Sequence, residues 1–157
     1  MLEKNNIYPA RIEGYTSEGL GVARIDGQAV FVHRALRGED CDVLILKVLK
    51  NAAFGKAVRV YAPSPHRVEP DCPYYGRCGG CDFRHMDREE ELEAKRQRVQ
   101  DALRRIGGSA VTVESIDGGE PLHYRNKSQY PVAADGSVGF YRARSHQVVP
   151  VEQCLIQ

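Results

Sequence analysis

Three cysteines and three glycines fall within the ten residues from Cys72 to Cys81. The spacing is Cys72-x5-Cys78-x2-Cys81, and Cys154 follows 73 residues after Cys81. A loop that wraps an inorganic centre needs backbone angles that glycine permits most readily. Glycine also lets backbone N–H groups approach ligand sulfurs and spread their negative charge. Three thiolates from one loop and one from a distant segment are typical of a four-ligand metal centre.

The spacing leaves two kinds of centre open. A zinc ion with four cysteine ligands is one, although such sites usually pair two Cys-x2-Cys knuckles and only one is present here. An iron–sulfur cluster is the other. Unrelated buried thiols would be a third interpretation, but the clustering with glycine argues against it. Cys41 stands apart in a β-rich stretch and is expected to be a small core residue.

The composition of the chain excludes several classes of protein. Its 157 residues are 42% hydrophobic and 27% charged, which is the balance of a soluble globular protein. No apolar run approaches the roughly 20 residues that cross a bilayer, and the first residues lack the features of a secretory signal. We therefore expect a cytoplasmic protein with reduced thiols and no membrane partner. The formal net charge of +1 gives no global sign of nucleic-acid binding, so any such surface must be local.

Residues 7–61 have the pattern of five short strands. Ile7–Glu13 alternates apolar and polar residues, and Asp26-Gly27 is a favoured pair for a tight hairpin turn. Five strands with glycine-marked turns in so short a stretch predict a small OB-like barrel. Three prolines make residues 63–71 an extended linker.

The one long helix is expected over Asp87–Gly107. Asp87 and Glu90 form a capping-box pattern. Acidic residues crowd the first turns and basic residues the last, which suits the helix dipole. An apolar stripe at helical spacing is made by Leu92, Val99, Leu103 and Ile106. Further strands are expected over residues 111–116, 127–132, 137–141 and 147–151, which makes the fold class mainly β with one long helix, an α+β protein.

The segment Cys72-Pro-Tyr-Tyr-Gly-Arg-Cys-Gly-Gly-Cys81, followed by a charged helix, resembles the cluster-binding segment of the RNA (uracil-5-)-methyltransferase family, in particular its 23S ribosomal RNA enzymes of the RumA/RlmD type. The preceding β unit resembles the RNA-binding TRAM barrel of that family, on Gly19–Arg24, Val30–Val32 and Ala35–Glu39. Downstream, Tyr124–Lys127 and the stretch from Gly139 to Cys154 are similar to the family's central domain.

The resemblance implies three regions: a TRAM-like RNA-binding barrel over residues 1–62, the Pro-rich linker over 63–71, and an incomplete iron–sulfur-binding central domain over 72–157. It also implies a [4Fe–4S] cluster held by Cys72, Cys78, Cys81 and Cys154. The expected substrate is RNA, specifically ribosomal RNA, and the expected state is a monomer.

The catalytic machinery of that family has no counterpart in the sequence. Methylation at C5 of uracil needs a cysteine nucleophile that adds to the ring. In the family it also needs a C-terminal Rossmann-like domain that binds S-adenosylmethionine. Gly19-x-Gly21 lies in the β unit and precedes no helix, so it is not a dinucleotide loop. We expect the chain to be the RNA-recognition half of such an enzyme, inactive by itself. A freestanding RNA-binding module with a zinc or iron–sulfur site, and a zinc-stabilised interaction domain, are the rival hypotheses.

RNA contacts are expected where basic and aromatic residues interleave, because stacking on unpaired bases combined with phosphate neutralisation is how single-stranded RNA is gripped. The alternative is a solvated strand face with its aromatic residues in the core. Candidates in the β unit, beside turns, and in the C-terminal region are Arg24, His33, Arg34, Arg37, Arg125, Lys127, Tyr141, Arg142, Arg144 and His146.

Overall fold

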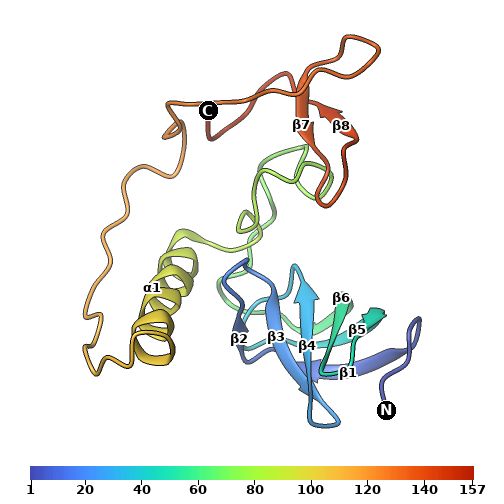
Figure 1. Cartoon of the computed structure of the whole chain (residues 1–157), viewed down its shortest axis with the longest axis vertical. Coiled ribbons are helices and arrows are strands. Elements are labelled where there is room, and N and C mark those ends of the chain that lie inside the picture. Colours follow the sequence, from blue (N-terminus) through green and yellow to red (C-terminus); the bar gives the residue numbers. More distant parts are fainter.

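The computed structural model describes all residues, 1–157. Its first part is a six-stranded sheet of β1 (Ile7–Arg11), β2 (Gly14–Tyr15), β3 (Gly21–Ile25), β4 (Gln28–His33), β5 (Asp40–Val48) and β6 (Ala52–Ala62). A linker and the cysteine loop lead to α1 (Arg88–Arg105), and the chain closes with the hairpin of β7 (Gly139–Tyr141) and β8 (Val148–Pro150). Figure 1 shows the curled sheet, the helix beside it and the hairpin at the far end of the molecule.

The sheet has the strand order β1-β5-β6-β4-β3-β2. All pairs are antiparallel except β4 with β6, which is parallel. The strands curl so that their alternate side chains enclose one core, whose fully buried members include Val30, Val32, Val43 and Ile45. The predicted mainly β, OB-like architecture with one long helix is confirmed in this coarse form. The predicted number of five strands is corrected to six, because the two-residue β2 also pairs with β3.

Two local predictions in the sheet are confirmed. Asp26 and Gly27 both have positive φ, at 50° and 76°, and they join β3 to β4 as a tight hairpin. Cys41 is 1% exposed and lies in the core of the sheet. Burial raises the pKa of its thiol to about 11, so it stays protonated at neutral pH.

The helix begins where the sequence predicts, because the Asp87 side chain accepts a hydrogen bond from the backbone N–H of Glu90. The predicted apolar stripe is not the buried face, however. Val99 is 49% and Ile106 87% exposed, whereas the buried helix residues are Glu90, Ala94 and Gln100. The apolar stripe does not mark the buried face because the helix packs on its neighbours mainly through polar side chains, among them Glu90 and Gln100.

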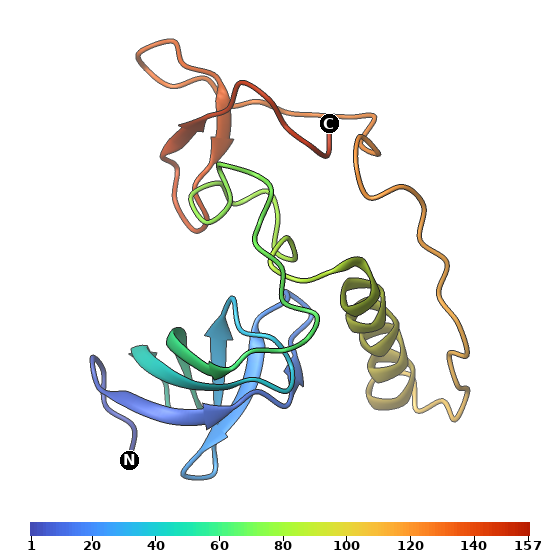
Figure 2. The same ribbon diagram turned by 180° about the vertical axis from the view of Figure 1, so that it is seen from behind.

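Residues 107–138 contain no helix or strand, so the predicted strands over 111–116 and 127–132 are wrong. The first of these stretches is extended, but helix side chains take the place of a partner strand. Gln100 donates to the carbonyl of Val111 and accepts from the N–H of Val113, and Arg96 donates to the carbonyl of Val113. Figure 2 shows this segment running along the helix and then on to the C-terminal hairpin. The predicted strands over 137–141 and 147–151 correspond to β7 and β8.

The curled sheet of β1 to β6, called the barrel below, is joined to the rest of the chain by two buried carboxylates. Glu39 is fully buried and accepts two hydrogen bonds from the guanidinium of Arg67, at 2.5 and 2.7 Å. Glu90, in the first turn of α1, accepts from Tyr15 and Arg37 of the barrel. The linker residue Arg67 and the helix are therefore held against the barrel by charge-assisted hydrogen bonds. The single helix lacks the run of apolar residues that crossing a membrane requires.

Candidate metal centre and nucleic-acid interface

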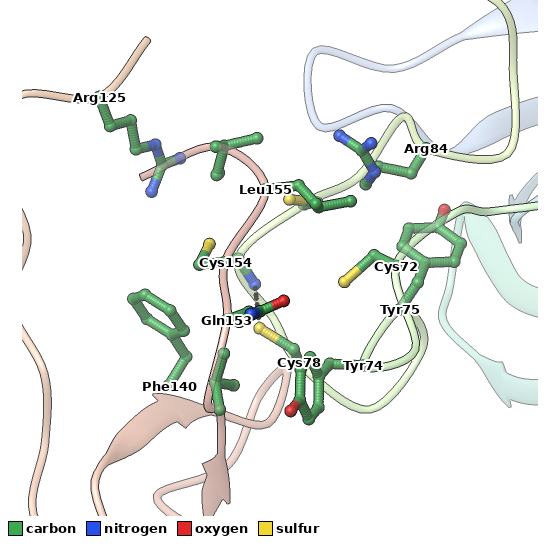
Figure 3. Close-up of a pocket in the computed structure, with 14 residues that line it drawn as sticks. Cys72, Tyr74, Tyr75, Cys78, Arg84, Arg125, Phe140, Gln153, Cys154 and Leu155 are labelled. Atoms are coloured by element: carbon green, nitrogen blue, oxygen red, sulfur yellow. Dashed lines mark hydrogen bonds between the residues drawn. The ribbon is translucent and has the colours of Figure 1, made fainter. Parts of the chain in front are cut away.

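All four predicted cysteine ligands line one pocket, between the cysteine loop and the C-terminal segment. Figure 3 shows the sulfurs of Cys72 and Cys78 directed towards the C-terminal segment that carries Cys154. The remaining wall is largely apolar, and its polar side chains include Arg84 and Arg125. All four thiols are half-buried and free. Together they offer four soft donors in a site that is shielded on several sides from water.

The cysteine loop is built from tight local turns. The carbonyl of Cys72 accepts from the N–H of Tyr75, and the carbonyl of Tyr74 accepts from the N–H of Cys78. The N–H of Gly80 then donates to the sulfur of Cys78 at 3.3 Å. This last bond is the N–H···S contact that stabilises a ligating thiolate.

Hydrogen bonds to two distant parts of the chain hold the C-terminal segment that carries Cys154 beside the cysteine loop. The N–H of His123 donates to the carbonyl of Leu155, and the N–H of Arg125 to that of Ile156. The hydroxyl of Tyr74 accepts from the N–H of Glu152 at 3.2 Å, which ties the loop to the C-terminal segment.

Burial raises the pKa of Cys78 and, to about 11, that of Cys81. The neighbouring thiols add to both shifts, because adjacent thiolates would repel one another. The pocket therefore disfavours free thiolates at Cys78 and Cys81, so their deprotonation would have to accompany the binding of a cation.

No group of three or more His, Cys, Asp or Glu side chains is gathered closely enough to hold a single metal ion. Four thiolates around one zinc ion, each at about 2.3 Å, would stand about 3.8 Å apart. The four cysteines line one pocket but do not form such a group.

The cysteine loop also contacts the barrel. Gly76 has φ of 88°, and a side chain there would collide with the guanidinium of Arg34, which lies over the ring of Tyr75 at 5.2 Å. Gly19 of the barrel likewise packs against the ring of Phe83. The glycines of this region therefore serve close contact between the barrel and the loop.

The predicted RNA-contact residues divide into those that the structure brings together and those that it separates. His33 and Arg34, at the end of β4, lie near Arg144 of the β7–β8 turn, and burial followed by these two cations lowers the pKa of His33. The same turn carries Arg142 and His146, with His146 edge-on to the ring of Tyr141. This group joins the barrel to the hairpin.

The other candidates lie elsewhere. Arg24 is near the β3–β4 turn, at the opposite end of β4 from His33. Arg37 is ion-paired with Glu90, so its charge is already neutralised. Arg125 lines the cysteine pocket, and Lys127 is exposed on the irregular segment.

The predicted RNA-contact residues do not include one aromatic pair. Phe31 of β4 and Phe54 of β6 are register partners whose ring centroids are 5.3 Å apart. Arg144 lies over the ring of Phe54 at 5.5 Å. Val30 and Val32 are buried in the core, so strand alternation could have placed Phe31 on the opposite face; its pairing with Phe54 follows only from the parallel contact of β4 with β6.

Residues 2–58 match the family model described as TRAM domain. This part of the chain is a TRAM domain. A TRAM domain is an RNA-binding domain, and its bounds here enclose β1 to β5 and the first part of β6.

The comparison with whole proteins extends the similarity beyond the TRAM domain. An uncharacterized RNA methyltransferase of Clostridium tetani is 43% identical over 160 residues, which cover 99% of this chain and 35% of that protein. One of Caldanaerobacter subterraneus is 47% identical over 154 residues, or 96% of this chain and 34% of that protein. The chain therefore spans about a third of the length of these relatives.

A solved structure shares the fold over most of the chain. The tRNA (uracil-54, C5)-methyltransferase of Pyrococcus abyssi, solved in complex with S-adenosyl-L-homocysteine, matches with a TM-score of 0.58 and 21% identity. The match covers 94% of this chain and 32% of that one. The likeness includes the region beyond the TRAM domain, which therefore has a known architecture.

Proposed function

We propose that this chain is the RNA-recognition and cluster-binding part of an S-adenosylmethionine-dependent RNA (uracil-5-)-methyltransferase that acts on ribosomal RNA. The observation that carries the proposal is the juxtaposition of an RNA-binding TRAM domain with a pocket lined by all four predicted cysteine ligands. Relatives named RNA methyltransferases that match nearly the whole chain support it. The uracil C5 position and the ribosomal substrate rest on the resemblance of the Cys72–Cys81 segment.

The donor set fits a [4Fe–4S] cluster better than a single zinc ion. Cys72, Cys78, Cys81 and Cys154 would hold it, with the N–H of Gly80 beside one sulfur. Iron–sulfur clusters are held by cysteine thiolates, and the spacing Cys72-x5-Cys78-x2-Cys81 lacks the second Cys-x2-Cys knuckle that zinc sites with four cysteines usually have. When bound, the cluster supplies a rigid crosslink between distant segments.

The charge of such a cluster argues that its role is structural. Four thiolates and a core of charge about 2+ carry about 2− together, so the cluster would not attract phosphate. Methyl transfer to uracil also consumes no electrons. The cluster instead closes the long connection between Cys81 and Cys154, and thereby fixes the β7–β8 hairpin relative to the cysteine loop.

Exposed apolar side chains favour a part of a larger enzyme over a freestanding module. Val99 and Ile106 of the helix, Val111 beyond it, and Tyr124 and Val132 of the irregular segment are all exposed. A domain packed against the helix and the irregular segment would cover these side chains.

Three measurements on the isolated chain test the proposal. Protein purified without air should contain about four iron and four sulfide per chain and should bind unpaired RNA with an affinity that falls as salt rises. Stoichiometric zinc in protein never exposed to air would contradict the cluster, and the absence of salt-dependent RNA binding would contradict RNA recognition. Incubated with S-adenosylmethionine and ribosomal RNA, the chain alone should produce no 5-methyluridine, because the cofactor-binding domain and the cysteine nucleophile of that family have no counterpart in this sequence.

A further inference from the structure

The outer face of the sheet carries two phenylalanines side by side. Phe31 and Phe54 occupy matching positions on the parallel strands β4 and β6, with their rings inclined at 57°. Their chain neighbours Val30, Val32 and Ala53 are fully buried in the core, so strand alternation directs both rings to the opposite side. The two rings are only half-buried and belong to no described part of the core.

Cationic side chains surround this pair. Arg144 lies over the ring of Phe54 and belongs to the β7–β8 turn, about 90 residues farther along the chain. Two register positions beyond the rings, Lys56 of β6 is paired with His33 of β4, and Lys47 of β5 is the partner of Phe54 on its other side. Glu18 and Asp82 line the neighbouring cleft with His33 and Arg34, so the negative charges lie on the side of the cysteine loop.

We propose that this face is a stacking site for an unpaired RNA base, with Phe31 and Phe54 as the platform and Lys56 and Lys47 on the flanking phosphates. Arg144, which covers the Phe54 ring in the free protein, gives up this place to the base and binds the adjacent phosphate. The proposal rests on the proposed RNA-binding function and names the nucleotide state that the face accepts. Aromatic rings between cations bind single strands, because every base has a face to stack and every linkage has a charge to neutralise. A duplex would be a poor ligand, since its bases are already stacked on one another.

The site is composite, because Arg144 belongs to the hairpin and not to the TRAM domain. The hairpin is held by the cysteine loop: Cys78 forms an isolated antiparallel bridge with Arg142, and the N–H of Gly79 donates to the carbonyl of Tyr141 at 2.9 Å. The order of the cysteine loop therefore decides whether Arg144 reaches Phe54. A TRAM domain alone would present the rings without this cation.

The test uses the full chain and an unstructured, uridine-rich RNA of about 12 nucleotides that carries one 2-aminopurine, whose fluorescence is quenched by stacking. Phe54→Leu removes the ring and keeps an apolar side chain. Tyr61→Leu is the matched control, because Tyr61 is an exposed aromatic on the same strand with its own cation, Arg59, at 4.7 Å. We expect Phe54→Leu to weaken binding about tenfold and to abolish the quenching, while Tyr61→Leu changes neither.

A second experiment removes the charge of Arg144 and leaves the residues of the sheet unchanged. Arg144→Gln should lower the slope of log affinity against log salt by about 0.7, the value for one phosphate of a single strand, whereas Arg59→Gln should leave it unchanged. Annealing the RNA to its complement should weaken binding to the wild-type chain. Arg144→Gln also keeps the test decisive if Phe54→Leu fails to fold.

The outcomes separate the two proposals. If the wild-type chain binds RNA but Phe54→Leu and Arg144→Gln behave like their controls, the stacking site is wrong and RNA recognition lies on another face. If the wild-type chain binds the duplex as well as the single strand, the preference for an unpaired base is wrong. If the wild-type chain binds no RNA at all, the proposed function itself fails.

Discussion

The hydroxyl of Tyr15 donates a hydrogen bond of 2.6 Å to the carboxylate of Glu90, 75 residues farther along the chain. Tyr15 lies in β2 of the TRAM domain and Glu90 in the first turn of α1. The second carboxylate oxygen of Glu90 accepts from Arg37 at 2.9 Å, and the Glu90 side chain is 4% exposed. A single buried carboxylate thus fastens the helix to the barrel.

Replacing Glu90 by alanine should lower the free energy of unfolding by about 1–3 kcal/mol, because Tyr15 and the half-exposed Arg37 lose their common acceptor. Denaturation by urea measures the loss. Glu89→Ala is the matched control, since Glu89 is an exposed acid in the same helical turn. Equal stability of the two variants would show that the contact between barrel and helix does not depend on Glu90.

Glu90 shows which interactions can be predicted from the sequence and which cannot. Its position three residues after Asp87 correctly predicts the start of the helix, because capping is a local interaction. Its side chain does not complete the capping box, because two barrel residues far away in sequence bind it instead. The Asp26-Gly27 hairpin was predictable for the same local reason, whereas the pairing of Phe31 with Phe54 depends on parallel strands that no local pattern specifies.

The candidate metal centre also has one part that the sequence predicts and one part that it does not. The loop spacing from Cys72 to Cys81 is visible in the sequence, and the family resemblance adds Cys154. The path that brings Cys154 to the loop was not predictable, because it depends on the backbone bonds of His123 and Arg125 with the C-terminal residues. Those bonds join two irregular segments whose sequences have no hydrophobic periodicity from which the pairing could be predicted.

Gly79→Ala should disturb the contact between the cysteine loop and the hairpin. An added methyl group would lie 2.9 Å from the backbone nitrogen of Ala143 and 3.0 Å from the carbonyl oxygen of Tyr141, and neither backbone atom can move freely. We expect a loss of stability of about 1–3 kcal/mol and weaker binding of unpaired RNA. Gly119→Ala is the control, because its methyl group would meet no atom within 4 Å. Identical melting and RNA binding of the two variants would contradict the role of Gly79.

His85 should make the stability of the protein depend on pH. It is 2% exposed, and burial, reinforced by the positive charges of Arg67 and Arg34, lowers its pKa to about 4 against the opposing effect of Glu39. Its ring Nδ1 is hydrogen-bonded to the hydroxyl of Tyr75 at 2.6 Å. The unfolded chain takes up a proton near pH 6.5 and the folded chain only near pH 4, so this contribution is complete above pH 6.5 and is lost as pH falls towards 4.

The shift predicts a loss of about 2–4 kcal/mol between pH 6.5 and pH 4 from His85. The measurement is the free energy of unfolding by urea across that range for the wild type and for His85→Gln. The variant should be less stable at pH 7, because it loses the packing of the ring, but its stability should fall less steeply with acid. Parallel pH profiles for the two proteins would exclude His85 as the origin of the dependence.

Cys154→Ser tests whether the proposed cluster orders the RNA-binding surface. Cys154 and Cys81 are 73 residues apart, so loss of one ligand releases the constraint between the C-terminal segment and the loop. The hairpin would lose its fixed position, and with it Arg144 would leave Phe54. We expect lower iron content, a lower melting temperature and weaker RNA binding, while residues 7–61 keep the hydrogen-exchange protection of a folded barrel.

Cys41→Ala is the control, because Cys41 is a buried thiol in the core of the sheet and not a proposed ligand. The Cys41→Ala protein should keep its iron, which separates the loss of a ligand from the loss of any cysteine. If Cys154→Ser kept full stability and RNA affinity, the crosslink would not be structural. Control of RNA binding by oxidation of the cluster would then be the hypothesis to test, by comparing the affinity of reduced and oxidised protein.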